Sequence, residues 1–525
     1  MKIYAVSLEP YIIAIGLRRV AAAARHAGYK VKSVYYLSNA FRTSLAGAWW
    51  KQRLGDSFSV NNMKDREPLI RLADAIGDAD VVAFSLMSTQ REMCRALCEE
   101  IKKRNAKVKI MIGGYHPTAF PEHAIAFADG ICRGEGERIF PEFLRRVESG
   151  ENLKGLKNTW VREGGEIIKN SMDSLLTPEE MEKMPFMEYT AEDQYLFSAV
   201  HGVLKPMEKK DYLLHVGTAY NTIWSVGCPY KCSFCTNEKA IEFNRGYAKQ
   251  RGPSVNYIIR EIKEAADHFP VDYVIFNDSD FLARDIEDLK EFARRFKNEI
   301  GLKIKTNGLN PVSVSEEKMK VLTEAGLVRT MMGFESGSRN TLELYRRSGG
   351  PEALRKAAAV LSKFKRKMAA PCFEIITDNP FETDKDLYET IDFLDSIPGP
   401  FTISLFGLCL MPGTALAEMC KSEETLKEHV DKEYLYSYTP TPPNLIISLF
   451  AVFKPPHFLV KMLKKWSRGR EKKFYPRLKS ILYKMMLVRR ALDQARVGDF
   501  STFPYQVMLM YHWLRRKKKR NGHGS

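Results

Sequence analysis

The stretch Cys228-Pro-Tyr-Lys-Cys232-Ser-Phe-Cys235 guides the interpretation of this 525-residue sequence. It places three thiols within eight residues, directly after the strand-like segment 222–226 and a glycine. A structural zinc site would need four protein ligands, and neither a second cysteine pair nor a histidine pair lies nearby. Three thiolates from one loop better suit a [4Fe-4S] cluster that keeps one iron open.

Downstream of the cysteines, short apolar segments alternate with amphipathic helical ones. Strands are predicted at 273–276, 302–306, 328–333, 373–377 and 402–408, and helices at 255–266, 286–296, 316–325, 352–364 and 384–394. With segment 222–226 this makes six βα units, which predicts a partial (β/α)6 barrel. Catalytic groups in such folds belong at the carboxyl ends of the strands.

Polar residues stand where those strands end. The candidates are Asp278, Asp280, Asn307, Glu335, Ser336 and, on the helix that follows, Arg346 or its neighbour Arg347, of which Arg346 is taken as the candidate. Each has an ordinary structural alternative that stays open. The two aspartates could cap a helix, Glu335 could pair with Arg329, and the two arginines could lie on a solvated helix face.

The first 150 residues alternate between short apolar strands and helices as well, which predicts an open parallel sheet of the Rossmann-like, flavodoxin-like type. Ligands of such sheets sit at the carboxyl ends of the strands. The loops there are rich in glycine and small hydroxyls, which let a large flat ligand approach the backbone. The candidate residues are Ser85, Ser88, Gly113, Gly114, His116, Thr118, Glu135, Gly136 and Glu137. Ordinary turns are the alternative for any one of these loops.

Taken together, residues 1 to about 420 resemble the radical S-adenosylmethionine (SAM) enzymes that contain a cobalamin (B12)-binding domain. The resemblance rests on the Cys-x3-Cys-x2-Cys spacing with Phe234, on Gly333-x-Glu-Ser-Gly337, and on Gly113-Gly-x-His-Pro-Thr118 followed by Arg133-Gly-Glu-Gly-Glu137. The Asp-x-His-x-x-Gly motif that supplies a histidine ligand to cobalt in other cobalamin proteins is absent. The glycine usual after the fifth barrel strand is replaced, the chain reading Asp378-Asn379.

The resemblance implies a [4Fe-4S] cluster on Cys228, Cys232 and Cys235, with SAM beside it and cobalamin held by the first domain without a histidine on cobalt. His116 would then contact the nucleotide tail or the corrin side chains. Phe234, Asp278, Asp280, Asn307, Ser336 and Arg346 would contact SAM, and Glu335 would hold its ribose hydroxyls. Reductive cleavage of SAM to a 5′-deoxyadenosyl radical would permit methylation of an unactivated carbon on a small molecule or lipid, with flavodoxin or ferredoxin as electron donor. Cyclisation, rearrangement and a non-catalytic iron-sulfur module remain alternatives.

We therefore predict four parts: a cobalamin-binding-like domain at 1–150, a hairpin and linker at 151–212, the barrel at 213–420 and a basic helical region at 421–525. Segment 151–212 is interpreted as an interdomain strap without catalytic residues. Nine cysteines in so long a chain do not make a disulfide scaffold. No apolar run approaches the ~20 residues of a spanning helix. The amino terminus is interpreted as a strand, and we expect a cytoplasmic protein.

The formal charge of +17 lies in the last part of the chain. Residues 454–525 hold 20 of the 81 Lys and Arg but only 3 of the 64 Asp and Glu, so that the first 453 residues are balanced at 61 of each. Segment 458–500 has helical periodicity, and an apolar patch at 505–514 runs into the basic run 515–520. Two interpretations stay open: a helical cap on the barrel, or a peripheral contact with an anionic membrane. Nucleic acid is disfavoured because no binding module is recognisable.

Overall fold

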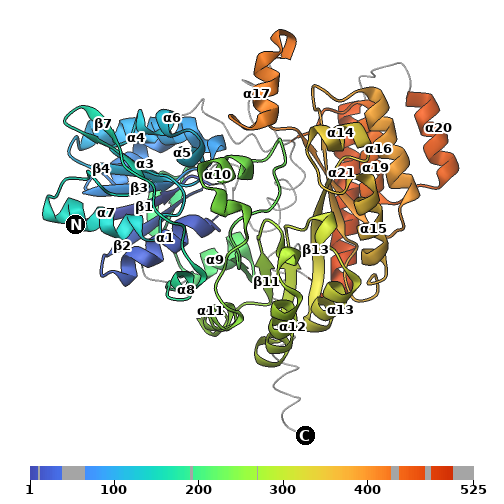
Figure 1. The fold of residues 1–525 in the computed structure, drawn as a ribbon, viewed down its shortest axis with the longest axis horizontal. Coiled ribbons are helices and arrows are strands. Elements are labelled where there is room, and N and C mark those ends of the chain that lie inside the picture. The colour runs from blue at the N-terminus through green and yellow to red at the C-terminus, as the bar shows by residue number, and fades with distance from the viewer. Residues whose placement is uncertain are drawn as a thin grey trace, which may run out of the picture.

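The computed structural model describes residues 1–9, 12–37, 66–189, 193–268, 270–426, 437–467 and 475–499. It contains two β-sheets, each accompanied by helices, and Figure 1 shows the amino-terminal sheet on the left and the second sheet on the right. The α/β class predicted from the sequence is confirmed.

The first sheet has nine strands in the order β7-β6-β5-β4-β3-β1-β2-β8-β9. Its five central strands and β8 run parallel, and antiparallel hairpin strands complete both edges. Side chains alternate along each strand, so Ile3 and Ala5 enter one apolar core and Tyr4 and Val6 the other. The strands of its parallel part are β1 (Ile3–Ser7), β2 (Val31–Leu37), β3 (Val81–Ser85), β4 (Lys109–Gly113) and β5 (Gly130–Cys132).

Helices cover both faces of this sheet. One core contains residues of α1 (Ile15–His26) and α7 (Ile139–Ser149), and the other contains residues of α3 (Glu67–Ala75) and α4 (Arg91–Arg104). The core on the α1 side continues without interruption into the core of the second sheet. The two sheets therefore share one hydrophobic core and are fixed relative to each other.

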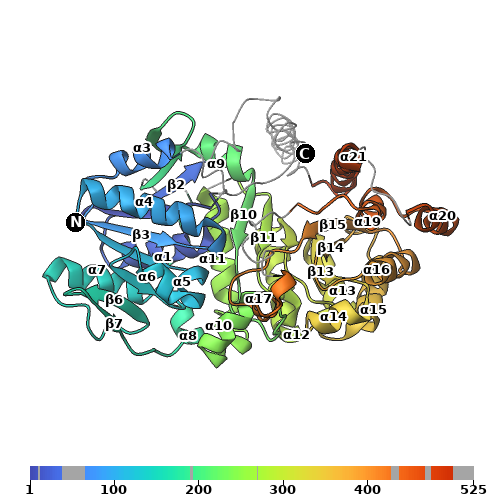
Figure 2. The ribbon, with the colours of Figure 1, turned by 90° about the horizontal axis from the view of Figure 1, so that it is seen from above.

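The second sheet has six parallel strands in chain order, as predicted for the partial barrel. They are β10 (Ala219–Thr222), β11 (Tyr273–Phe276), β12 (Lys303–Thr306), β13 (Leu327–Glu335), β14 (Cys372–Thr377) and β15 (Thr402–Gly407). The intervening helices line its outer side in Figure 2: α11 (Val255–His268), α12 (Ile286–Arg295), α13 (Glu316–Ala325), α14 (Arg339–Leu344), α15 (Gly350–Ser362) and α16 (Asp384–Ser396).

The first barrel strand lies earlier than the sequence predicted. We expected it at 222–226, but β10 ends at Thr222. The backbone amides of Trp224 and Ser225 instead donate to the carboxylate of Asp278, at 3.1 and 2.7 Å. A buried carboxylate thus replaces the sheet as their hydrogen-bond partner, which an apolar pattern cannot reveal.

Segment 151–212 contains more structure than predicted. The expected hairpin is present as β6 (Thr159–Glu163) and β7 (Glu166–Lys169). The linker after it, however, holds a second hairpin, β8 (Gln194–Ser198) and β9 (Val203–Pro206), with β8 pairing parallel to β2. It also forms two short helices, α8 (Pro178–Met181) and α9 (Lys209–Val216). The interpretation of this segment as a plain strap was therefore incomplete.

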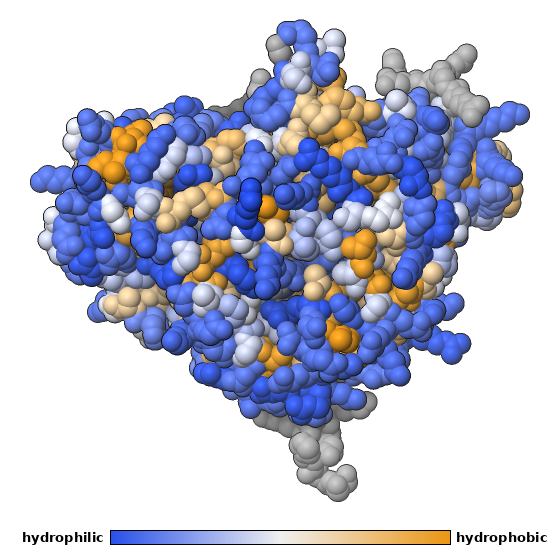
Figure 3. Space-filling model, viewed as in Figure 1, coloured by the Kyte–Doolittle hydropathy of each residue, from blue (hydrophilic) through white to orange (hydrophobic). Residues whose placement is uncertain are grey.

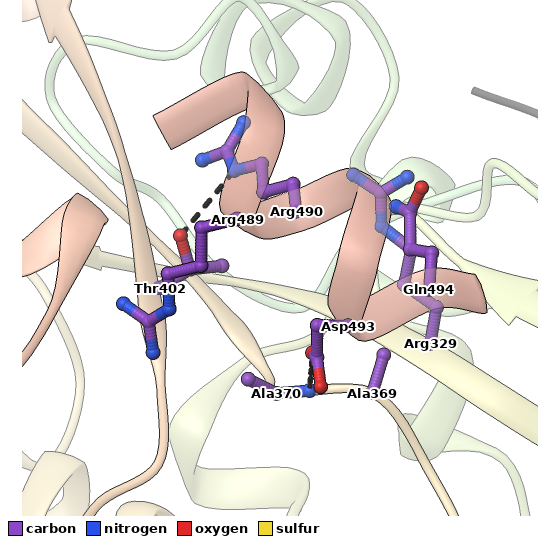
Figure 4. A pocket seen from close by; sticks show the side chains of 8 residues that line it. All are labelled: Arg329, Ala369, Ala370, Thr402, Arg489, Arg490, Asp493 and Gln494. Carbon is purple, nitrogen blue, oxygen red and sulfur yellow. Dashed lines mark hydrogen bonds between the residues drawn. The ribbon is translucent and has the colours of Figure 1, made fainter. Parts of the chain in front are cut away.

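The carboxyl-terminal helices are α17 (Ala415–Ser422), α19 (Pro442–Val452), α20 (His457–Ser467) and α21 (Tyr475–Arg496). Arg490 of α21 donates to Thr402 at 3.3 Å, and the amide of Ala370 donates to Asp493 at 2.5 Å (Figure 4). Beyond the helix, Asp499 forms an ion pair with Lys305 at 2.8 Å, and both side chains are buried. Helix α21 is therefore a cap at the amino-terminal ends of the barrel strands.

The apolar patch at 505–514 and the basic run at 515–520 lie outside the described residues. Among the helices that the structure does describe, none has both the length and the hydropathy needed to cross a bilayer. The face seen in Figure 3 is mainly hydrophilic, with apolar side chains in small separate areas.

Candidate active site

The three cysteines lie in the loop that follows β10. Gly227 adopts a φ of +101°, and a Cβ there would lie 2.4 Å from the carbonyl oxygen of Lys249, so only glycine fits. Cys228 and Cys232 are buried and Cys235 is partly exposed. Burial raises the pKa of all three thiols, that of Cys235 to about 12. The loop therefore groups three thiols that are largely shielded from water.

Asp278 and Asp280, predicted to contact SAM, accept hydrogen bonds from this loop and from the residues just before it. Asp278 accepts from the amides before the loop, as described, and the hydroxyl of Ser225 also donates to it at 2.5 Å. Asp280 accepts from the hydroxyl of Tyr230, between the first two cysteines, at 3.1 Å. Burial raises the pKa of Asp278, and the Ser225 bond partly opposes it. Both carboxylates are thus engaged in positioning the cysteines.

Glu335 lies at the end of β13 and folds back over the strand. Its φ is +68°, and a Cβ on Gly333 would lie 2.2 Å from its Oε1, which explains the glycine two residues earlier. Arg347 lies 3.4 Å from this carboxylate and donates to Sγ of Cys232 at 3.6 Å. Burial raises the pKa of Glu335, and Arg347 partly lowers it. A carboxylate, a guanidinium and one of the three loop cysteines therefore adjoin one another.

The structure distinguishes the two arginines that the sequence could not. Arg346, the residue taken as the candidate, has a side chain 55% exposed and pairs with Glu238 at 2.6 Å. Arg347 is almost buried and faces the cysteines. Glu335 pairs with Arg347 and does not pair with Arg329, so the sequence alternative for Glu335 is wrong. Arg347 is the functional candidate that the sequence analysis did not select.

The other barrel candidates surround this group. The Phe234 ring packs edge-on against Tyr345, with centroids 5.0 Å apart. Ser336 is buried and lies 3.0 Å from the hydroxyl of Thr390, which fixes the turn after β13. Asn307 is exposed and donates to Asn277 at 2.9 Å, so its amide is the more accessible of these groups.

The turn after β14 keeps a left-handed residue although its glycine is replaced. Asp378 itself adopts a φ of +58°. Its carboxylate accepts from the amide of Thr439 at 2.6 Å and from the side chain of Asn444 at 3.1 Å. Aspartate tolerates this backbone region better than most residues, and the two bonds offset its cost. The helix after this turn starts with a capping box of Thr383 and Asp386.

The candidate loops of the first sheet bond mainly to one another. The His116 ring is buried, with Nδ1 3.0 Å from the Ser88 hydroxyl and Nε2 2.9 Å from His123. Burial lowers the pKa of His116 to about 3, so the ring is neutral. Gly114 adopts a φ of +99°, and a Cβ there would lie 2.9 Å from the Leu86 backbone. With both ring nitrogens engaged, this histidine is not free to ligate a metal.

The remaining loop residues connect neighbouring strands. Thr118 donates to Gly114 at 2.8 Å and accepts from the amide of Gly134 at 2.9 Å. Glu137 is half-buried, and its desolvation raises its pKa. Ser85 and Gly113 are register partners at the ends of β3 and β4, and a Cβ on Gly136 would lie 3.2 Å from the side chain of Val20.

Two contacts connect this loop edge to the cysteine loop. The hydroxyl of Tyr115, in the short helix α5 (Tyr115–Ala119), donates to Oδ1 of Asn237 at 3.1 Å. Asn237 starts α10 (Asn237–Phe243), two residues after the last cysteine. Glu135 pairs with Arg251 at 2.6 Å. The sequence analysis missed Tyr115, Asn237 and Arg251, because no local pattern shows which loops of two domains meet.

The side chains at the barrel edge fit an iron-sulfur cluster and a ligand that carries a carboxylate and hydroxyl groups. Three cysteines from one loop supply the thiolates that a [4Fe-4S] cluster needs. Within the described residues, buried Nε of Arg347 has no hydrogen-bond partner. A guanidinium with a free nitrogen suits a carboxylate, and the adjacent Glu335 suits hydroxyl groups. The enclosed pocket in Figure 4, lined by Arg329 and residues of α21, lies at the opposite end of the strands and is not part of this site.

Comparisons with known families match two segments of the chain. Residues 1–144 match the B12 binding domain, and residues 222–394 match the radical SAM superfamily. An uncharacterized methyltransferase of Pyrococcus horikoshii is 25% identical over 413 residues, which cover 77% of this chain and 80% of that protein.

Solved structures share the fold. The radical SAM methyltransferase TsrM of Kitasatospora setae, with cobalamin and a [4Fe-4S] cluster bound, aligns with a TM-score of 0.60 and 16% identity over 80% of this chain and 79% of that one. The cobalamin-dependent SAM radical enzyme OxsB, with aqua-cobalamin and SAM bound, aligns with the same score and identity over 100% of this chain and 81% of that one.

Proposed function

Because this chain belongs to the radical SAM enzymes that carry a B12-binding domain, we propose that it methylates an unactivated carbon of a small molecule or lipid. It is an enzyme whose cofactors are a [4Fe-4S] cluster, SAM and cobalamin. When bound, these groups supply a carbon radical that removes a hydrogen atom and a methyl group that can take its place.

The proposal rests on one observation: the loop edge of the first sheet contacts the region beside the cysteine loop of the barrel. Tyr115 follows Gly114 in the candidate cobalamin loop and bonds to Asn237, next to the cysteine loop. A substrate between these edges would be within reach of both cofactor sites. Removal of hydrogen and delivery of methyl at the same carbon need such an arrangement, because both reacting groups must approach one atom.

The residues of the chain have separate tasks in this proposal. Cys228, Cys232 and Cys235 supply thiolates, and burial of the first two excludes water from their sulfur atoms. Arg347 would hold the carboxylate of SAM through its Nε, which has no partner among the described residues, and Glu335 would hold the ribose hydroxyls. Since Arg347 also touches Cys232, the same side chain fixes SAM relative to the cluster. We expect a flavodoxin or ferredoxin to deliver the electrons.

The test uses anaerobically reconstituted enzyme, a chemical reductant and SAM with an isotopically labelled methyl group. Small-molecule and lipid extracts serve as separate substrate pools, and mass spectrometry follows the label. Methylation predicts a labelled product, with equal amounts of 5′-deoxyadenosine and S-adenosylhomocysteine, only when cobalamin is present. A cyclisation or rearrangement would give 5′-deoxyadenosine without S-adenosylhomocysteine and would contradict the proposal. Cys232→Ala is the control, since it should form no 5′-deoxyadenosine.

A further inference from the structure

One face of helix α21 is apolar and exposed. Its inner side packs on the barrel, with Leu482 and Met486 buried. On the outer side, four side chains recur at intervals of four, three and four residues, which places them on one helix face. This α21 stripe consists of Ile481 (53% exposed), Met485 (46%), Val488 (47%) and Leu492 (67%). Continuous exposed apolar surface of this kind marks an interaction site.

An open groove of about 650 Å³ runs beside the stripe. Met485, Val488 and Leu492 line it together with Lys484 and Arg496. Helix α20 also combines exposed apolar side chains with basic ones. Phe458 (72% exposed) and Met462 (57%) lie one turn apart, next to Lys461 and Lys465. In Figures 1 and 2, α20 lies at the end of the molecule away from the amino-terminal sheet.

Most of the charges around these apolar side chains are positive. Lys461, Lys465, Arg477 and Lys484 are exposed and make no hydrogen bond or ion pair with any residue that the structure describes. The acidic residues described from 442 onward are Asp493 and Asp499. Asp499 pairs with Lys305 in the interior, whereas Asp493 accepts from the amide of Ala370, pairs with Arg496 at 3.1 Å and also lines the groove. Of the carboxylates beside these helices, Asp392 of α16 pairs with Lys464 and Asp493 pairs with Arg496, so the outer surface of this cap carries an excess of unpaired cations within the described residues.

We propose that the α21 stripe and the adjoining cations dock on an anionic lipid surface. Apolar side chains can enter the interface while lysines and arginines contact the headgroups. A second copy of this chain is a poorer occupant, because like charges would face each other across the contact. This proposal goes beyond the proposed function, since lipid binding requires neither the cluster nor cobalamin.

The test must keep the whole chain. Arg489 of α21 donates to the carbonyl of Phe401 at 2.9 Å, and the Lys305–Asp499 pair follows the helix, so truncation before α21 would damage the barrel. Substitutions on the exposed stripe leave these inward contacts intact. The matched control is Met172→Asp, because Met172 is 45% exposed but lies in the linker after β7.

The experiment is vesicle co-sedimentation of the full chain with phosphatidylcholine alone and with an equimolar mixture with phosphatidylglycerol. We expect binding to the mixed vesicles only, weakening as salt rises. The double variant Val488→Asp/Leu492→Asp should lower affinity at least about tenfold, and Lys484→Gln about fivefold, whereas Met172→Asp should bind like the parent. Unchanged melting temperatures would show that the variants fold.

Three outcomes would overturn the proposal. They are failure of the parent protein to bind mixed vesicles, equal binding by the double variant, and equal binding to neutral vesicles. A concentration-dependent dimer in sedimentation velocity that the double variant abolishes would assign the stripe to a second copy, and would also overturn it.

Discussion

The candidate residues at the barrel edge differ from those at the edge of the first sheet in where their polar atoms point. At the barrel edge, a buried nitrogen of Arg347 has no partner in the part of the chain that the structure describes, and the same side chain donates to Cys232. At the edge of the first sheet, the polar side-chain atoms of His116 and Thr118 form hydrogen bonds with neighbouring loop residues. The barrel edge therefore offers a charged group beside the cysteines. The edge of the first sheet offers mainly shaped backbone, together with the buried Nε of Arg133 and Oε1 of Gln90, which have no hydrogen-bond partner among the described residues. We therefore expect substitutions at the barrel edge to have larger effects than substitutions at the edge of the first sheet.

The largest effect should come from the cysteine loop. Replacing Cys228, Cys232 or Cys235 with alanine removes one of three thiolates, so cluster absorbance and SAM cleavage should both disappear. Anaerobic absorbance spectroscopy and 5′-deoxyadenosine analysis measure the two properties. Cys94→Ala, a buried cysteine of the first sheet's core, is the control and should retain both. A single variant of the loop that kept its cluster would refute the assignment.

The second effect concerns the two adjacent arginines. Arg347→Gln should lower the rate of SAM cleavage by about 100-fold, because it removes a desolvated charged donor from the site. Arg346→Gln removes an exposed ion pair with Glu238 and should change the rate less than about twofold. Equal losses in the two variants would show that Arg347 has no special position. The spectrum of the cluster should persist in both proteins.

Much of the barrel could be predicted because its strands and its cysteine loop are local patterns. The features that the prediction missed are contacts between distant segments. Asp278 holds Trp224, 54 positions away, and Tyr115 meets Asn237, 122 positions away. Such partners become neighbours only after the fold is complete. The choice between Arg346 and Arg347 was equally inaccessible, because a turn and not a regular helix sets their directions.

The third effect tests whether the first sheet binds cobalamin through backbone shape. His116→Ala should weaken cobalamin binding by about tenfold, because it leaves Ser88 and His123 without their buried partner. The paramagnetic resonance spectrum of the bound cobalt(II) should not change, since neither ring nitrogen is free. A nitrogen splitting from a protein histidine in the parent protein would disprove this prediction.

The smallest effect is on stability against pH. Burial holds the pKa of His116 at about 3, against an ordinary value of 6.5. The unfolded chain therefore takes up a proton below pH 6.5 that the folded chain does not, so stability falls as the pH drops from 6.5 toward 3. At pH 5.5 the expected loss from this group is about 1.4 kcal/mol relative to neutral pH, or about 1 °C in melting temperature for a chain of this length. His116→Asn cannot titrate, so its melting temperature should fall less over the same interval, even if it starts lower. Thermal unfolding of both proteins at pH 7.5 and 5.5 measures the two slopes, and parallel slopes would mean that His116 is accessible to protons in the folded protein.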